Sequence, residues 1–161
     1  MVFEEEGSAE MFFKIKAKLT EFHRLFIGIK IGQLTKEEGL EHCRATLVQA
    51  VKAGERMCIM IDRIAPDFKE EFNDETLFPT DKIFNFKEFR KMETYKSIIT
   101  EEEDRDYQDN KGNYLMHEDY TLVILSTARN EEEKQAVIDN LPCLDSFEII
   151  EIVKELPKSS Y

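Results

Sequence analysis

The sequence predicts an α/β fold, a small parallel sheet flanked by helices. Two runs are apolar almost throughout, residues 57–61 and 120–125. Both predict strands, and the first predicts a strand buried on two faces. A capped helical pattern precedes the first run and another follows the second, an order typical of the α/β class. The 161 residues fit a domain that folds without a disulfide or a metal.

Residues 1–34 are expected to form an N-terminal tail and one amphipathic helix, ahead of the α/β domain. Residues 1–10 are acidic and are expected to fray. Apolar residues then recur every three or four positions, which predicts a helix with one buried face. These residues are Phe12, Ile15, Leu19, Phe22, Phe26 and Ile29.

The α/β domain is expected to span residues 35–156 and to begin with a helix. Thr35 followed by Glu38 is a capping-box pattern, and Gly54 is a favourable C-terminal stop. The buried strand at residues 57–61 comes next and runs into Asp62. Helix, glycine turn and buried strand together predict one αβ unit.

A long mixed insertion is expected at about residues 66–118. It is rich in phenylalanine and in charge, and one helix in it is expected to start after Asn85. Its aromatic residues are either core or an exposed surface for docking a partner, and the sequence leaves both readings open. The candidates are Phe68, Phe72, Phe78, Phe84, Phe86 and Phe89.

The second predicted strand is followed by two hydroxyl residues, Ser126 and Thr127. Asn130 is a good N-cap, and three glutamates fill the next turn, so a short helix is expected there. A third strand is expected at residues 147–153, and residues 157–161 are expected to form a tail.

Charge narrows the choice of partners. The formal net charge of −12 disfavours nucleic acid and anionic membranes, and it favours basic protein surfaces. The N-terminus lacks the basic and then apolar pattern of a secretory signal, and no apolar run approaches the roughly 20 residues of a membrane span. We therefore expect a cytoplasmic protein whose partners are other proteins.

The strand that ends in Asp62 raises the question of a nucleotide site. In P-loop proteins such an aspartate helps to hold Mg²⁺ and a glutamate commonly follows it, whereas here Arg63 follows. The phosphate-binding motif GxxxxGK[ST] is missing from the sequence. Asp62, Ser126 and Thr127 are therefore candidates for a vestigial nucleotide site. The alternative is that they are ordinary strand-end residues that satisfy nearby backbone groups.

The order of elements over roughly residues 40–153 resembles the second half of an AAA+ ATPase core. More narrowly, "AVKAGERMCIMIDRIAPDFKEEF" with "LFPTDKIF" resembles the C-terminal segment of the IQ-motif-and-AAA-domain ciliary proteins. These belong to the nexin–dynein regulatory complex of motile axonemes. The IQ region and the phosphate loop of that family are missing from this sequence. The resemblance implies a non-catalytic structural subunit of a ciliary axoneme.

Two other functions stay open. Arg63 or Arg129 could reach an ATP site of a partner, because an arginine finger can be supplied in trans. An enzyme of an unrecognised class would need carboxylates or histidines gathered in a cavity.

Neither catalytic residues nor a cofactor site can be read from the sequence. The three histidines lie far apart, which disfavours a zinc site. A calcium loop starting at Asp104 fails, because Asp109 holds the glycine position and Leu115 the final glutamate position.

Overall fold

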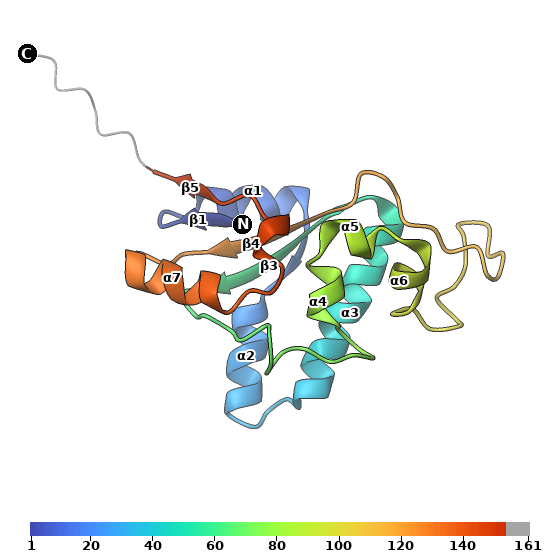
Figure 1. Ribbon diagram of the computed structural model, residues 1–161, viewed down its shortest axis with the longest axis horizontal. Coiled ribbons are helices and arrows are strands. Elements are labelled where there is room, and N and C mark those ends of the chain that lie inside the picture. Colours follow the sequence, from blue (N-terminus) through green and yellow to red (C-terminus); the bar gives the residue numbers. More distant parts are fainter. Residues whose placement is uncertain (154–161) are drawn as a thin grey trace, which may run out of the picture.

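The computed structural model describes residues 1–153 and contains a five-stranded sheet with helices on both faces (Figure 1). All neighbouring strands are parallel, and their order is β2-β3-β4-β1-β5. The predicted α/β class with a parallel sheet is therefore confirmed. The strands are β1 Val2–Glu4, β2 Lys18–Thr20, β3 Arg56–Asp62, β4 Thr121–Ser126 and β5 Ile150–Ile152.

The helices cover the two faces of the sheet unequally. The helices are α1 Ser8–Lys16, α2 Phe22–Lys30, α3 Lys36–Ala53, α4 Thr80–Ile83, α5 Phe86–Phe89, α6 Met92–Lys96 and α7 Glu131–Asp139. On one face α1 packs on a small cluster that includes Cys58, Met60 and Leu125. The other helices share the larger core on the opposite face, and Figure 1 shows α2 and α3 below the sheet with α1 above it. Among the described residues, no helix has both the length and the apolar character that a membrane crossing requires.

The central αβ unit forms as the sequence predicts. The Thr35 hydroxyl accepts a hydrogen bond from the Glu38 N–H, and the Glu38 side chain accepts one from the Thr35 N–H, so the capping box of α3 is complete. Gly54 ends α3 in the left-handed conformation, with φ of 68°. β3 is buried from Met57 to Ile61, as expected for a strand with helices on both faces.

The C-terminal elements agree with the prediction in kind but not in every boundary. The Asn130 side chain accepts a hydrogen bond from the Glu133 N–H at 2.8 Å and caps α7, as predicted. The third strand is shorter than expected, because Phe147 still belongs to the end of a 3-10 turn, Leu144–Ser146. Residues 154–156 of the predicted domain and the predicted tail at 157–161 lie outside the described residues.

The expected frayed end and single N-terminal helix are both wrong. Phe3 is only 2% exposed, and β1 lies inside the sheet between β4 and β5. The expected helix is split, because residues 18–20 leave the helical path and pair with residues 57–59 of β3. Sheet pairing overrides the helical period here, as tertiary contacts commonly do. Residues 1–34 are thus part of the same sheet-and-helix core.

The phenylalanine-rich segment is core, so most of the proposed docking surface is wrong. Phe68, Phe72, Phe78, Phe84 and Phe89 are at most 2% exposed. The first four rings pack edge-on or tilted against one another, for example Phe68 with Phe84 at 5.3 Å between centroids, and the Phe89 ring packs on Tyr120. Phe86 differs, being 50% exposed. The helix expected after Asn85 is replaced by three short helices, α4 to α6, and Asn85 caps the second of them.

Candidate functional site

The candidate site lies at the edge of the sheet where the strands end. Because the strands are parallel, the carboxyl ends of β1, β3 and β4 meet at one edge, where ligands of α/β proteins commonly bind. Ser126 pairs in register with Asp62 of β3 on one side and with Phe3 of β1 on the other. The structure therefore brings Asp62, Ser126 and Thr127 together, as predicted, and places Glu4 at the same edge.

Asp62 lies at an irregular strand end. Its φ of 54° is in the left-handed region, and the β3–β4 register shifts between Met60 and Asp62. Asparagine and aspartate tolerate this conformation better than other side chains do, and irregularities of this kind re-aim a side chain. The Thr127 hydroxyl donates to the exposed Asp62 carboxylate, and the Thr127 N–H donates to the Asp62 carbonyl at 2.9 Å.

Ser126 is fully buried, and both of its hydrogen-bonding capacities are used. Its hydroxyl donates to the Asp62 carbonyl at 3.2 Å and accepts from the Ala128 N–H at 3.1 Å. Ser126 and Thr127 therefore tie the ends of β3 and β4 together. These contacts are the strand-end role that the sequence left open beside the nucleotide role.

Glu4 was missed by the sequence reasoning, yet it makes the densest set of contacts at this edge. Its side chain is buried, with 3% of the residue exposed. One carboxylate oxygen accepts from the Ser8 N–H at 3.0 Å and also from the Ser8 hydroxyl, and the other accepts from the Ala9 N–H at 2.7 Å. The carboxylate thus holds two of the N–H groups that a helix leaves unpaired at its first turn.

The geometry around Glu4 is that of a strand, a tight loop and a helix. In phosphate-binding proteins this arrangement directs the first N–H groups of the helix at a phosphate. Here β1 leads through Gly7, with φ of 83°, into α1, and the Glu4 carboxylate takes the N–H groups. The N-terminus of α1 is thereby satisfied from within the chain.

The two candidate arginines have different surroundings. Arg63 donates to the Glu133 carboxylate, and this hydrogen bond is the largest cause that lowers the pKa of Glu133. The guanidinium is therefore held against the first turn of α7. Arg129 is exposed, and its backbone N–H donates to Glu133 at 2.8 Å, while its charge helps to lower the pKa of Glu133. Its guanidinium makes no hydrogen bond or ion pair within residues 1–153.

A hollow of about 200 Å³ opens beside Asp62, and ion pairs line it. Glu10 pairs with Lys14 at 2.5 Å, and Glu21 pairs with Arg24 at 3.1 Å. Its charged groups are therefore largely matched by neighbours on the same helix. In the described part of the chain, no group of three or more histidine, cysteine, aspartate or glutamate side chains is placed to hold a metal ion.

Comparison of the chain with protein-family models, with curated protein sequences and with solved structures found no match. The resemblance to AAA+ and ciliary proteins therefore stays a prediction. The interpretation of this edge rests on its geometry: a strand-end aspartate with its hydroxyl partners, and a glutamate that caps α1 from within.

Proposed function

We propose that the chain is a non-catalytic interaction module, in which an α/β scaffold resembling a nucleotide-binding core assembles with other proteins. The observation that carries this proposal is the buried Glu4 carboxylate on the N–H groups of Ser8 and Ala9. In a nucleotide site these groups would be free to bind a phosphate.

Electrostatics at the start of α1 also opposes a phosphate. An incoming phosphate would have to displace the Glu4 carboxylate from its hydrogen bonds, and like charges at short range repel. The loop between β1 and α1 consists of Glu5, Glu6 and Gly7, so it contributes two carboxylates and no lysine. A phosphate loop instead supplies a lysine and several glycines.

The Asp62 end of the site supports the same proposal. The residue after Asp62 is Arg63, which is ion-paired with Glu133, whereas hydrolysis needs a base that activates water. Asp62 itself is bonded to Thr127 at the strand end. The scaffold is retained while the groups that would bind and cleave a nucleotide are replaced.

The partners are proposed from charge and resemblance. A net charge of −12 favours docking on a basic protein surface. The resemblance to IQ-motif-and-AAA-domain proteins favours a structural subunit of the ciliary axoneme. Under this proposal the protein is cytoplasmic and belongs to a larger axonemal assembly.

The first test is calorimetric titration of the purified chain with MgATP and MgGTP to millimolar concentration. We expect no saturable heat and no hydrolysis. A saturable, Mg²⁺-dependent site in the wild-type chain would overturn the proposal and would return Asp62 and Ser126 as ligands. A pull-down of the tagged protein from ciliated cells tests the axonemal part, which fails if no axonemal protein is recovered.

The role of Glu4 is tested by stability. Glu4→Gln should lower the free energy of unfolding by about 1–3 kcal/mol, because the charge-assisted hydrogen bonds to Ser8 and Ala9 are lost. Glu5→Gln removes the same charge from an exposed neighbour and should change it by less than about 0.5 kcal/mol. Equal unfolding midpoints in urea for the two variants would contradict the capping role.

A second function is favoured by the exposed guanidinium of Arg129, which makes no hydrogen bond or ion pair within residues 1–153. The chain would then be a nucleotide-responsive subunit that supplies Arg129 in trans to a partner's ATP site. Arg129→Ala should in that case lower ATP hydrolysis by the assembled complex, whereas Arg63→Ala should not, because Arg63 is held by Glu133. Unchanged hydrolysis in both variants would exclude this function.

A further inference from the structure

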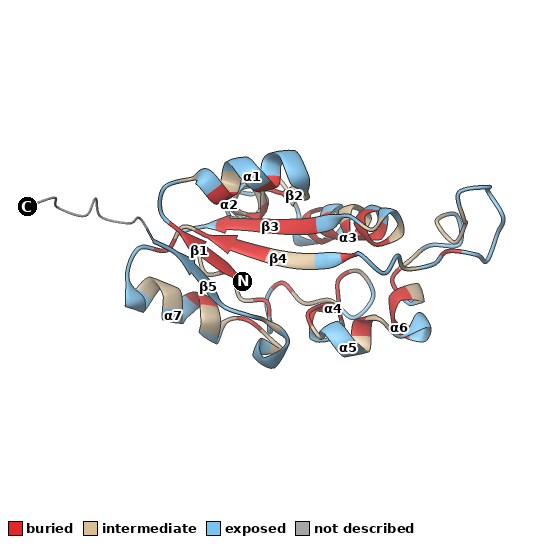
Figure 2. Ribbon diagram, turned by 90° about the horizontal axis from the view of Figure 1, so that it is seen from above, coloured by how far each residue is buried: buried red, intermediate tan, exposed pale blue. Residues whose placement is uncertain are grey.

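The upstream half of β4 has a strand on one side only, within the part of the chain that the structure describes. β3 pairs with β4 from Thr121 to Ser126. β1 pairs with it only at Leu125 and Ser126. In Figure 2 no strand lies beside this half of β4 on the side away from β3. Such a free edge is a template for another strand, because its backbone N–H and C=O groups are unpaired.

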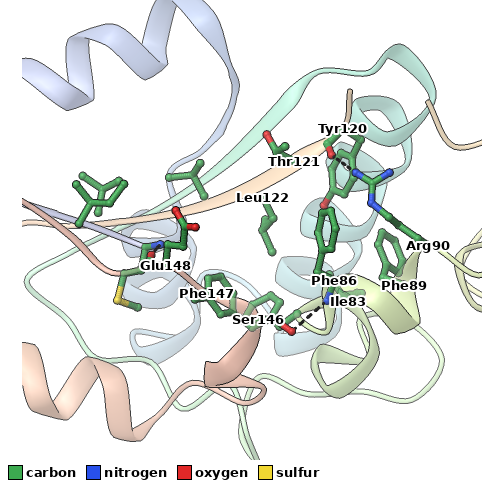
Figure 3. A pocket seen from close by; sticks show the side chains of 15 residues that line it. Ile83, Phe86, Phe89, Arg90, Tyr120, Thr121, Leu122, Ser146, Phe147 and Glu148 are labelled. Carbon is green, nitrogen blue, oxygen red and sulfur yellow. Dashed lines mark hydrogen bonds between the residues drawn. The ribbon is translucent and has the colours of Figure 1, made fainter. Parts of the chain in front are cut away.

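A cavity of about 270 Å³ lies against this free edge. Its walls are mostly apolar and include Leu122 and Val123 of β4, Phe86 and Phe89 of α5, and Phe147 ahead of β5. Figure 3 shows Leu122 pointing into the space between Phe86 and Phe147. Phe86 is the one proposed docking residue that is exposed, and its ring forms part of the cavity wall.

Two residues that line this cavity each carry a buried hydrogen-bond donor without a partner among the described residues. The donors are the Tyr120 hydroxyl and the Arg90 Nε. Tyr120 is 4% exposed, and burial raises the pKa of its phenol, so the hydroxyl keeps its proton. Arg90 is fixed in place, because its Nη2 donates to the Tyr120 carbonyl at 2.8 Å and its guanidinium lies over the Phe86 ring (Figure 3). Buried donors without an acceptor are rare in folded proteins, and an acceptor supplied by a bound partner would satisfy the Tyr120 hydroxyl.

The charges around the opening are acidic. Glu148 lines the cavity and is exposed. Glu118 and Asp119, just ahead of β4, are exposed as well. Over residues 1–153, the lining has two cations. The Met1 ammonium donates to the Glu148 carbonyl at 2.6 Å, and the hydrogen bonds of Arg90 direct it at the carbonyls of Glu118 and Tyr120. A segment entering here would thus meet an apolar space with carboxylates outside it, which favours basic flanks.

We propose that this edge and cavity bind an extended segment of a partner protein, in which an apolar residue is flanked by lysine or arginine. The segment adds as a strand beside residues 121–123, a recurring mode of peptide recognition. Its apolar side chain fills the space beside Leu122, and a backbone carbonyl accepts from the Tyr120 hydroxyl. The inference rests on the proposed role as an interaction module and names the kind of partner.

The test starts with a phage-displayed library of random heptapeptides selected on the full chain. The enriched sequences should share an apolar residue with lysine or arginine beside it. A synthetic enriched peptide should lose affinity about tenfold or more when alternate backbone amides are N-methylated, because strand pairing is blocked. Failure to enrich any sequence, or enrichment of acidic sequences, would overturn the proposal.

Two matched tyrosine variants separate binding from folding. Tyr120→Phe should weaken peptide binding about tenfold by fluorescence anisotropy, while the unfolding midpoint stays or rises, since the hydroxyl has no partner in the free protein. Tyr114→Phe loses the bond from the Tyr114 hydroxyl to the Val48 carbonyl at 2.7 Å, so it should destabilise the fold and leave peptide affinity unchanged. Wild-type affinity in Tyr120→Phe would overturn the proposal.

Other occupants give distinct results. Self-association in sedimentation that Tyr120→Phe abolishes would overturn the proposal, because the occupant would be a second copy of this chain. The result of the nucleotide titration is independent of the peptide-binding result, because Glu4 and Asp62 do not line this cavity.

Discussion

At the scale of single residues, the buried side chain of Arg44 connects α3 to the loop after α6. It is 4% exposed, and all of its N–H groups are used. Two fork-like pairs bind the carboxylates of Glu41 in α3 and Glu103 in the loop after α6, and Nη1 also donates to the Ile98 carbonyl at 2.9 Å. Bidentate pairs of this kind are the strongest hydrogen bonds between side chains. Arg44 therefore anchors the long middle segment to α3.

Arg44→Met should lower the free energy of unfolding by about 3 kcal/mol. This is the lower end of the loss expected when one partner of a buried ion pair is removed, because the carboxylates of Glu41 and Glu103 can still reach water. Urea denaturation followed by far-UV circular dichroism measures the change. Arg24→Met is the matched control, since Arg24 pairs with Glu21 on an exposed helix surface and should cost less than about 1 kcal/mol. Equal losses in the two variants would contradict this account.

At the scale of single elements, the end of α3 depends on a glycine for two reasons. Gly54 has φ of 68°, which strains any other residue, and a Cβ at this position would lie 2.3 Å from the Nδ1 of His117. His117 also donates its backbone N–H to the Val51 carbonyl at 2.9 Å, so the loop ahead of β4 is fastened to the end of α3.

Gly54→Ala should therefore destabilise the protein by about 2–3 kcal/mol, as the sum of backbone strain and a displaced His117 ring. Gly112→Ala should cost only the backbone strain, about 1 kcal/mol, because Gly112 has φ of 78° and nothing lies within 4 Å of an added Cβ. In a His117→Ala background the Gly54→Ala penalty should shrink to that of Gly112→Ala. An unchanged penalty in that background would show that the ring plays no part.

Elements of ordinary length were predictable, and the shortest ones were not. β3 and β4 stand out because helices cover both faces, so their apolar runs are continuous. β1 and β2 have three residues each, too few to show any period. The helical spacing from Phe12 to Ile29 was misleading, because Phe12 and Ile15 are exposed in α1 and Leu19 belongs to β2.

The candidate site was likewise predictable only in part. Asp62 and Ser126 were predictable because each ends a strong strand, and parallel strands end at one edge. The capping role of Glu4 was not predictable, since an acidic run at an N-terminus resembles a solvated tail. A usable signal was present: the carboxylate precedes Gly7 and Ser8, where a helix can start.

At the scale of the whole molecule, many carboxylates are held in their ionised form. Hydrogen bonds from Arg44 lower the pKa values of Glu41 and Glu103. Backbone N–H groups lower those of Asp74 and Asp104, and the Asn110 side chain lowers that of Asp106. A carboxylate whose pKa is lower in the folded state adds stability above its unfolded pKa, and this contribution is lost as the pH falls through the folded pKa.

The unfolding midpoint in urea should therefore fall steeply as the pH drops below about 4.5, the ordinary range for glutamate and aspartate. Measurements at pH 7, 5, 4 and 3 test this. Arg44→Met should give a shallower fall, because the largest cause of the low pKa values of Glu41 and Glu103 is removed. Parallel curves for the wild type and the variant would assign the acid sensitivity to other carboxylates.

The position of β1 has a consequence for the order in which the fold is completed. Residues 2–4 leave the ribosome well ahead of both of their neighbours in the sheet, β4 and β5. At typical rates of synthesis, β4 follows roughly 6–25 s later. The nascent chain must keep this apolar strand unpaired for that time, and such non-local pairing slows folding. A chaperone that shelters residues 2–4 as they emerge would therefore have its greatest effect on the side of the sheet formed by β4, β1 and β5.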